Sequence, residues 1–187
     1  ALLLQARRHA SWWRRSAQAL KGEAEQRVCA DMQRLPFARS SFDMVWSNLA
    51  LHGLTSPQRA FAEVHRVLRP GGVFLFTSFG PDTLKELRAA FAEADAAPHV
   101  NRFVDMHDLG DALVHAGFAD PVMEMETITL EYDTVPAALR DLKAIGAHNA
   151  TAGRARGLTG KSTLARMLAA YEGFRRDGLL PATYEVV

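Results

Sequence analysis

Polar and sulfur-containing residues follow three short apolar runs of this chain, and their types suit a ligand that carries an aromatic base. The three pairs are Asp31 and Met32, Ser47 and Asn48, and Thr77 and Ser78. A carboxylate accepts a hydrogen bond from an exocyclic amine, and a methionine thioether packs well on an aromatic ring. The small residues of the other two pairs let a ligand come close to the backbone. An acid after a strand is also a common turn former, so Asp31 alone leaves both interpretations open.

The elements that must position these pairs are predicted strands joined by helices. Continuous apolar runs predict buried strands over 28–32, 42–49 and 73–79. A helix should begin at Ser56, with Pro57 in its first turn, and end at the glycines of "RPGG". Strands that alternate with helices through short loops indicate an open α/β sheet with a mostly parallel centre. In such a sheet ligands bind beyond the carboxyl ends of the strands, which is where the three pairs stand.

The second half of the chain is predicted to be more helical. Helices are expected over 81–94 and 108–116, the latter closed by Gly117. Residues 121–132 alternate apolar with polar and predict an edge or antiparallel strand. Two amphipathic helices follow Pro136, and residues 182–187 read as a last strand.

Composition limits the class of protein. The chain has 187 residues, a net charge of +1 and 48% hydrophobic residues, which fits one globular domain with its own core. The single cysteine, Cys29, excludes a disulfide framework and fits a reducing cytoplasm. No apolar run approaches the roughly 20 residues of a membrane helix, and "ALLLQARRHASWWRR" lacks the order of an export signal. We expect a cytoplasmic protein with no membrane or nucleic-acid partner.

Several longer stretches resemble a known family. "ADMQRLPFARSSFDMVWSNLALH" and "AFAEVHRVLRPGGVFLFTSFG" resemble the second half of a class I S-adenosylmethionine-dependent methyltransferase. "FGPDTLKELRAAF", "HVNRFVDMHDLGDALVHAGFADPV", "IGAHN" and "LPATYEVV" are similar to the biotin-pathway malonyl-[acyl-carrier-protein] O-methyltransferases. The resemblance implies a Rossmann-like three-layer sandwich with an antiparallel edge strand. Residues 1–187 would form a single methyltransferase domain in which 136–180 are a helical insertion that covers the substrate.

The resemblance also assigns roles to residues. Asp31 would hold the adenine amino group of S-adenosylmethionine and Met32 would pack on the adenine ring. Asn48 would lie beside the methionine portion, with Leu49 close by. His52 would face the substrate, or it would be an ordinary histidine at a helix start. No metal is expected.

One departure from the family pattern stands out. The family binds its cofactor with a Gly-rich loop after the first strand and an acid after the second, and neither motif occurs here. Because "ALLLQARRHASWW" resembles the helix after the second strand, we expect the N-terminal strands to be missing. The strand at 28–32 would then lack its neighbour, and the chain alone would bind the cofactor poorly.

The expected substrate is malonyl-acyl-carrier protein, methylated on its free carboxylate. That carboxylate is ionised at neutral pH, so no catalytic residue is predicted, and an arginine could hold it. His148, Asn149 and Arg154 are candidates for the substrate site, although the first two could equally serve as caps. Basic residues after Pro136 could steer an acidic carrier protein, or they could form a solvated face. These residues are Arg140, Lys143, Arg154, Arg156, Lys161, Arg166, Arg175 and Arg176.

Two other functions stay open. The chain could be a methyltransferase-like assembly factor of respiratory complex I that acts on a protein arginine. It could also be a non-catalytic fragment that keeps a carrier-protein surface without a cofactor pocket.

Overall fold

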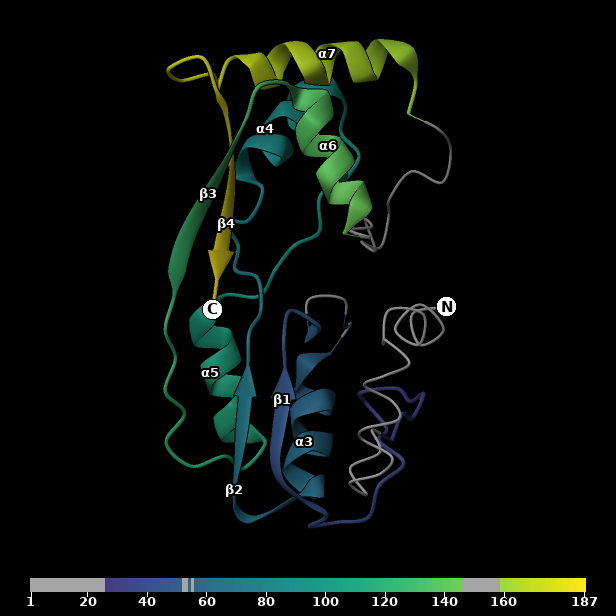
Figure 1. Cartoon of the computed structure of the whole chain (residues 1–187), viewed down its shortest axis with the longest axis vertical. Coiled ribbons are helices and arrows are strands. Elements are labelled where there is room, and N and C mark those ends of the chain that lie inside the picture. The colour runs from purple at the N-terminus through teal and green to yellow at the C-terminus, as the bar shows by residue number, and fades with distance from the viewer. Residues whose placement is uncertain (1–25, 52–53, 55, 146–158) are drawn as a thin grey trace, which may run out of the picture.

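The computed structural model describes residues 26–51, 54, 56–145 and 159–187 of the chain. These residues form two halves that lie end to end along an elongated molecule (Figure 1). We call β1, β2, α3 and α5 the lower half, and β3, β4, α4, α6 and α7 the upper half. Each half contains one two-stranded sheet covered by helices.

The lower half contains the predicted parallel strands. β1 (Phe42–Ser47) pairs in parallel with β2 (Leu68–Phe76), and α3 (Pro57–Val67) connects them. Helix α3 begins as predicted with Pro57 in its first turn and Ser56 in the extended N-cap conformation. The Ser56 hydroxyl does not cap the helix; it donates to the Gln58 side chain instead (3.1 Å). The helix ends at Val67, before the predicted glycines, and β2 follows at once. Gly71 lies within β2 and takes a φ of 77°, a conformation that glycine adopts without strain.

A second helix completes the core of the lower half. This helix is α5 (Met106–His115), and Asp105 is its N-cap: the Asp105 carboxylate accepts a hydrogen bond from the His107 amide (2.8 Å). Gly117 follows the helix with a φ of 96°. This confirms the predicted helix and its glycine end. The buried core residues contributed by α3, α5 and neighbouring segments are Leu51, Ala60, Phe61, Leu109, Ala112, Leu113 and Val187.

The upper half is built on an antiparallel pair. β3 (Glu126–Tyr132) pairs with β4 (Leu180–Val186), and this confirms the predicted antiparallel strand and the C-terminal strand. α4 (Lys85–Ala94), α6 (Val135–Ala144) and α7 (Lys161–Glu172) pack around it. The buried core residues of this half are Leu84, Leu87, Ala90, Ala94, Val100, Val135, Met167, Tyr171, Leu180 and Ala182.

A short set of backbone hydrogen bonds joins the two sheets, and we call it the seam. Ser78 and Val187 exchange two hydrogen bonds of 2.8 and 2.9 Å, and the Gly80 amide donates to the Glu185 carbonyl (2.9 Å). Residues 78–80 follow β2 along the chain, and Phe79 forms an isolated antiparallel bridge with Val186, so β4 lies next to the segment that leaves β2. The described strands form two separate two-stranded sheets, β1 with β2 and β3 with β4. The predicted fold class, a mostly α/β arrangement with an antiparallel edge, is confirmed.

The predicted strand over 28–32 is wrong. Residues 26–30 have no regular structure, and Asp31 forms only an isolated bridge with Arg34 inside a tight turn. A strand needs a neighbour to satisfy its backbone groups, and no described strand pairs with this segment. Val28 consequently stays 49% exposed.

No helix in the described part of the chain is long and apolar enough to cross a membrane.

Candidate functional site

The ends of β1 and β2 meet at a cluster of polar groups. The Thr77 hydroxyl donates to the Asn48 side-chain oxygen (2.6 Å), and the Thr77 amide donates to the Ser47 carbonyl (2.9 Å). The Leu49 amide donates to both the hydroxyl and the carbonyl of Thr77, at 2.9 and 3.1 Å. Two of the three predicted pairs are therefore joined directly, because parallel strands end at the same edge of a sheet.

Leu49 makes the turn at this edge. Its φ is 47°, a left-handed conformation that a leucine rarely adopts. The two hydrogen bonds from its amide to Thr77 offset the strain and hold the turn. The turn ends β1 abruptly and leaves Asn48 exposed at the strand exit.

The strand exit offers two polar groups to a ligand. The Ser47 hydroxyl is buried and has no hydrogen-bond partner among the described residues. Asn48 uses its oxygen on Thr77, so its amide nitrogen is left to donate. A buried polar atom without a partner and an exposed amide donor are the groups that a polar ligand would satisfy. The strand exit therefore has two groups, the Ser47 hydroxyl and the Asn48 amide nitrogen, that suit a polar ligand.

Asp31 and Met32 lie in a turn rather than at a strand exit. The Asp31 carboxylate accepts from the Gln33 amide (2.9 Å), and its carbonyl accepts from the Arg34 amide (2.9 Å). The turn-former interpretation of Asp31 is thus realised, although its exposed carboxylate keeps further lone pairs. Met32 is half-buried and packs against the lower core, which also contains Leu51. Adenine binding by this pair stays a prediction.

Four predicted substrate residues lie outside the described part of the chain. They are His52, His148, Asn149 and Arg154.

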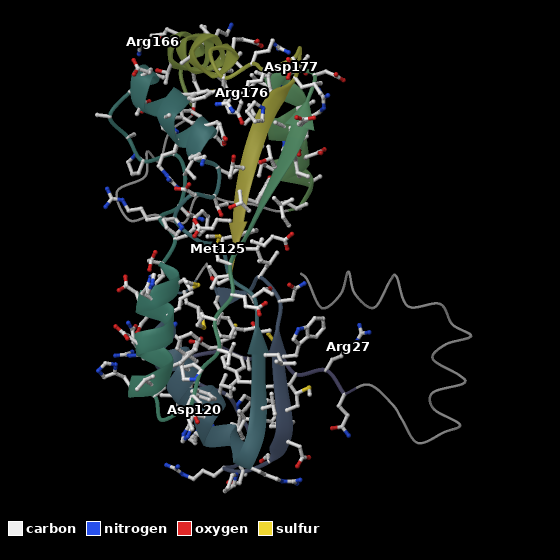
Figure 2. All side chains as sticks on the ribbon, turned by 90° about the vertical axis from the view of Figure 1, so that its left-hand side faces the viewer. Arg27, Asp120, Met125, Arg166, Arg176 and Asp177 are labelled. Carbon is white, nitrogen blue, oxygen red and sulfur yellow. The ribbon has the colours of Figure 1, made fainter. Side chains whose placement is uncertain are left out.

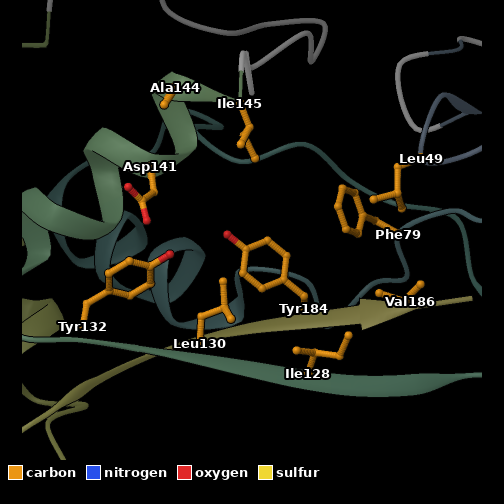
Figure 3. Close-up of a pocket in the computed structure, with 10 residues that line it drawn as sticks. All are labelled: Leu49, Phe79, Ile128, Leu130, Tyr132, Asp141, Ala144, Ile145, Tyr184 and Val186. Atoms are coloured by element: carbon orange, nitrogen blue, oxygen red, sulfur yellow. The ribbon is translucent and has the colours of Figure 1, made fainter.

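A pocket of about 400 Å³ opens beside the strand exit and is lined from both halves (Figure 3). Its walls are mostly apolar, and Leu49 and Phe79 lie at one side of it. The Phe79 ring packs against Phe103 and Tyr184, with centroids 5.6 and 5.9 Å away. The lining residues are Leu49, Phe79, Ile128, Leu130, Tyr132, Asp141, Ala144, Ile145, Tyr184 and Val186.

The other side of the pocket carries three oxygen-bearing side chains. Tyr132 from β3, Tyr184 from β4 and Asp141 from α6 turn their oxygens toward one another (Figure 3). Burial, with the Asp141 carboxylate adding its charge and a hydrogen bond, raises the pKa of Tyr132. Burial also raises the pKa of Tyr184 to about 12, and the nearby Tyr132 and Asp141 add to the effect. Both phenols are therefore protonated at neutral pH and can donate hydrogen bonds.

Leu49 connects the two parts of the site. It is bonded to Thr77 at the strand exit, and its side chain lines the pocket. A ligand bound at Asn48 and a second ligand in the pocket would therefore meet at Leu49. Such an arrangement suits a transfer between two bound molecules.

Apart from Leu49, the pocket residues were missed by the sequence analysis, although a signal for some of them exists. Residues 128, 130 and 132 of β3 and 184 and 186 of β4 lie at even positions, so each set shares one face of its strand. Asp141 and Ile145 are four residues apart and share one face of the helical turn. The pairing of Ile128 with Tyr184 brings the faces together, and a pairing over 56 residues cannot be read from local periodicity.

The basic residues of the upper half are mostly on its surface. Arg140, Lys143, Lys161 and Arg166 are exposed, and Arg175 is held by Glu172 (2.7 Å) and by the Gly178 carbonyl. Figure 2 shows Arg166 and Arg176 at the end of the molecule away from β1 and β2, whereas Met125 lies near the middle. Arg166 and Arg176 are therefore too remote to hold a substrate group at the strand exit.

No group of three or more potential metal ligands occurs within the described residues.

Comparison with known sequences identifies related proteins. Residues 10–76 match the family model of a methyltransferase domain. A malonyl-[acyl-carrier protein] O-methyltransferase of Laribacter hongkongensis is 64% identical over 160 residues, which are 86% of this chain and 54% of the relative. The enzyme of the same name from Gallionella capsiferriformans is 56% identical over all of this chain and 63% of its own length. The chain thus spans just over half of the length of these relatives.

Comparison with solved structures concerns the fold. The YcgJ protein of Bacillus subtilis has a TM-score of 0.57 at 16% identity, over 92% of this chain and 73% of that protein. A protein of Bacillus halodurans, named provisionally as a methyltransferase, has a TM-score of 0.53 at 18% identity, over 91% of this chain and 74% of that protein. The chain shares the Rossmann-like fold of these proteins.

Proposed function

We propose that the protein methylates the free carboxylate of malonyl-acyl-carrier protein, as a step of biotin synthesis. The proposal is supported by the methyltransferase model that matches residues 10–76 and by relatives, 56% and 64% identical, that are named malonyl-[acyl-carrier protein] O-methyltransferase. A methyltransferase domain implies use of S-adenosylmethionine. The observation that carries the proposal is the position of Leu49, which belongs both to the polar strand exit and to the pocket.

The reaction needs alignment more than acid–base chemistry. The bound sulfonium supplies a methyl group: a carboxylate oxygen bonds to the methyl carbon while the carbon–sulfur bond breaks and its electron pair stays on sulfur. The acceptor is already ionised at neutral pH, so no residue has to remove a proton. The chain's own residues would position the reactants and exclude water.

We assign the cofactor side to the strand exit. Asn48 would donate its amide to the methionine portion, and the Ser47 hydroxyl would gain the partner it lacks. Asp31 and Met32 would receive the adenine, with the Asp31 carboxylate accepting from the amino group. Leu49 and Phe79 would form the apolar boundary across which the methyl group passes.

The upper half would receive the substrate. In this proposal residues 1–187 act as one methyltransferase domain, and the helical region 136–180 covers the acyl group. His52, His148, Asn149 and Arg154 remain candidates for contacts to the malonyl group. The exposed Arg140, Lys143, Lys161 and Arg166 would attract the acidic surface of an acyl carrier protein.

A methyl-transfer assay tests the function. The full-length protein would be incubated with S-adenosylmethionine labelled in its methyl group and with malonyl-acyl-carrier protein, the unloaded carrier protein, or an arginine peptide. We expect label in a base-labile ester on the malonyl-loaded carrier alone. Label on the arginine peptide alone would instead support the assembly-factor function, and binding of the carrier protein without any transfer would support the non-catalytic one.

A further inference from the structure

We propose that Asp141 and Tyr184 bind the first amide of the pantetheine arm that carries the acyl group. The inference rests on the proposed function, in which the substrate is an acyl group joined to a carrier by a thioester. Such an arm has a thioester, two methylene groups and then a secondary amide. The amide is the first polar group behind the reacting end, so it is a natural point of recognition.

The polar side of the pocket complements a secondary amide. An amide offers one N–H donor and one carbonyl acceptor. The exposed Asp141 carboxylate can accept from the N–H. The Tyr184 hydroxyl is protonated, points into the pocket and makes no hydrogen bond to another described residue, so it can donate to the carbonyl.

Tyr132 acts as a positioning residue for Asp141. Its hydroxyl is turned toward the Asp141 carboxylate, which lies on the last turns of α6 and helps to raise the pKa of Tyr132 (Figure 3). A hydrogen bond from the phenol would use one of the roughly four acceptor positions of the carboxylate and fix the direction of the others. The amide would therefore meet a carboxylate that is already oriented.

The apolar walls match the part of the substrate between the amide and the reacting carboxylate. Along the pocket in the close-up, Leu130 lies beside the two tyrosines, Ile128 near the middle, and Val186 below Leu49 and Phe79 (Figure 3). Six bonds separate the malonyl carboxyl carbon from the amide nitrogen, a distance of about 7–8 Å when the chain is extended. A pocket of about 400 Å³ has the size of an ordinary small-molecule site.

Asp141 also sets the direction in which the substrate enters. A malonyl carboxylate placed beside Asp141 would put two negative charges together in a largely apolar pocket, which is unfavourable. The malonyl carboxylate is therefore directed to the opposite side, where Leu49 borders the strand exit. The same carboxylate would attract the amide and repel the reversed substrate, so it would contribute to specificity in both ways.

Two small substrates separate amide recognition from acyl recognition. Malonyl-N-acetylcysteamine thioester contains the amide, and malonyl pentyl thioester has the same chain length without it. With the full-length protein we expect Asp141→Ala to lower kcat/KM for the first substrate roughly tenfold or more, the range for a lost hydrogen bond to a charged group. The effect on the pentyl thioester should be no more than about twofold, because that substrate has no amide to lose.

Further variants sharpen the test. Tyr184→Phe should also lower kcat/KM for the amide-containing thioester selectively, by a smaller factor than Asp141→Ala. Asp141→Asn should keep more of this kcat/KM than Asp141→Ala, because its side-chain oxygen still accepts a hydrogen bond. Asp111→Asn, an exposed acid on α5, is the matched control and should change neither substrate. Equal losses of Asp141→Ala on both thioesters would overturn the inference. Failure of the unaltered protein to methylate either thioester or malonyl-acyl-carrier protein would instead overturn the proposed function.

Discussion

The core of the lower half contains a cluster of phenylalanine rings, whereas the upper half combines an apolar core, which includes Tyr171, with buried polar side chains. In the lower half Phe61 of α3 lies 5.9 and 5.6 Å from the rings of Phe74 and Phe76 on β2. In the upper half the buried Glu86 carboxylate accepts from the Thr183 hydroxyl (2.5 Å) and amide (3.1 Å).

This difference follows from what each half must hold. The lower half presents backbone and small polar groups at a strand exit, so its helices need only to fix two strands. The upper half must hold the 81–85 turn against β4, and it does so through polar side chains: the Thr83 hydroxyl donates to the Glu185 carbonyl (3.0 Å). Aromatic packing between α3 and β2 thus supports the strand exit in the lower half. Hydrogen bonds between the segment 83–86 and β4 add support to the pocket in the upper half.

The largest effect is expected from removing the aromatic centre of the lower half. Phe61 is fully buried, so Phe61→Ala should lower the free energy of unfolding by about 3–5 kcal/mol through lost burial and a cavity. Urea denaturation followed by circular dichroism would measure it. Phe61→Leu, which keeps most of the volume, should cost clearly less. A Phe61→Ala protein as stable as the unaltered protein would show that the packing of this ring does not hold the lower half.

A smaller effect is expected from the polar centre of the upper half. Glu86→Ala leaves the Thr183 hydroxyl and amide without their acceptor, and it should cost about 1–3 kcal/mol. The same denaturation measurement applies, with the exposed Glu93→Ala on the same helix as control. If the Glu86→Ala protein is as stable as the control, the buried hydrogen bonds between Glu86 and Thr183 do not stabilise the upper half.

The smallest effect concerns acid sensitivity of the lower half. The Arg66 guanidinium, 2.8 Å from Glu63, lowers the pKa of that carboxyl to about 2, from an ordinary value of 4.5. The stabilisation from this pair is therefore present above pH 4.5 and is lost as the pH falls toward 2. Because both side chains are partly in contact with solvent, it should amount to less than about 1 kcal/mol.

The measurement is the stability of Glu63→Gln relative to the unaltered protein at pH 6 and at pH 3. The difference in unfolding free energy between the two proteins should be larger at pH 6 than at pH 3. A difference that grows on acidification would contradict the pairing. Glu124→Gln, an exposed residue between α5 and β3, serves as the control.

The sequence predicted those parts of the fold whose patterns are local. Pro57 marks the start of α3 and Gly117 the end of α5, and the apolar runs predicted the positions of β1 and β2. The predicted burial of these two strands is wrong, because one face of the pair is left uncovered within the described residues: Met44, Trp46, Val73 and Leu75 are 47–71% exposed. The strand at 28–32 was predicted from its apolar residues alone, and it does not form because pairing depends on a neighbour that sequence periodicity does not reveal.

The candidate site shows the same division. Asn48 could be predicted from the abrupt change to polar residues after β1, whereas Leu49 was implied only by the family resemblance, and the structure brings both to Thr77. The roles of these residues toward a cofactor stay predictions. Tyr132, Asp141 and Tyr184 were not predicted, because they meet only through the folding of β3, α6 and β4 against one another.

The seam fixes the position of the pocket relative to the strand exit. Ser78 and Val187 exchange two backbone hydrogen bonds, and Val187, which directly follows β4, is buried in the core of the lower half. The end of one strand therefore connects both cores, so that a molecule at the strand exit and a molecule in the pocket would be held at a set separation.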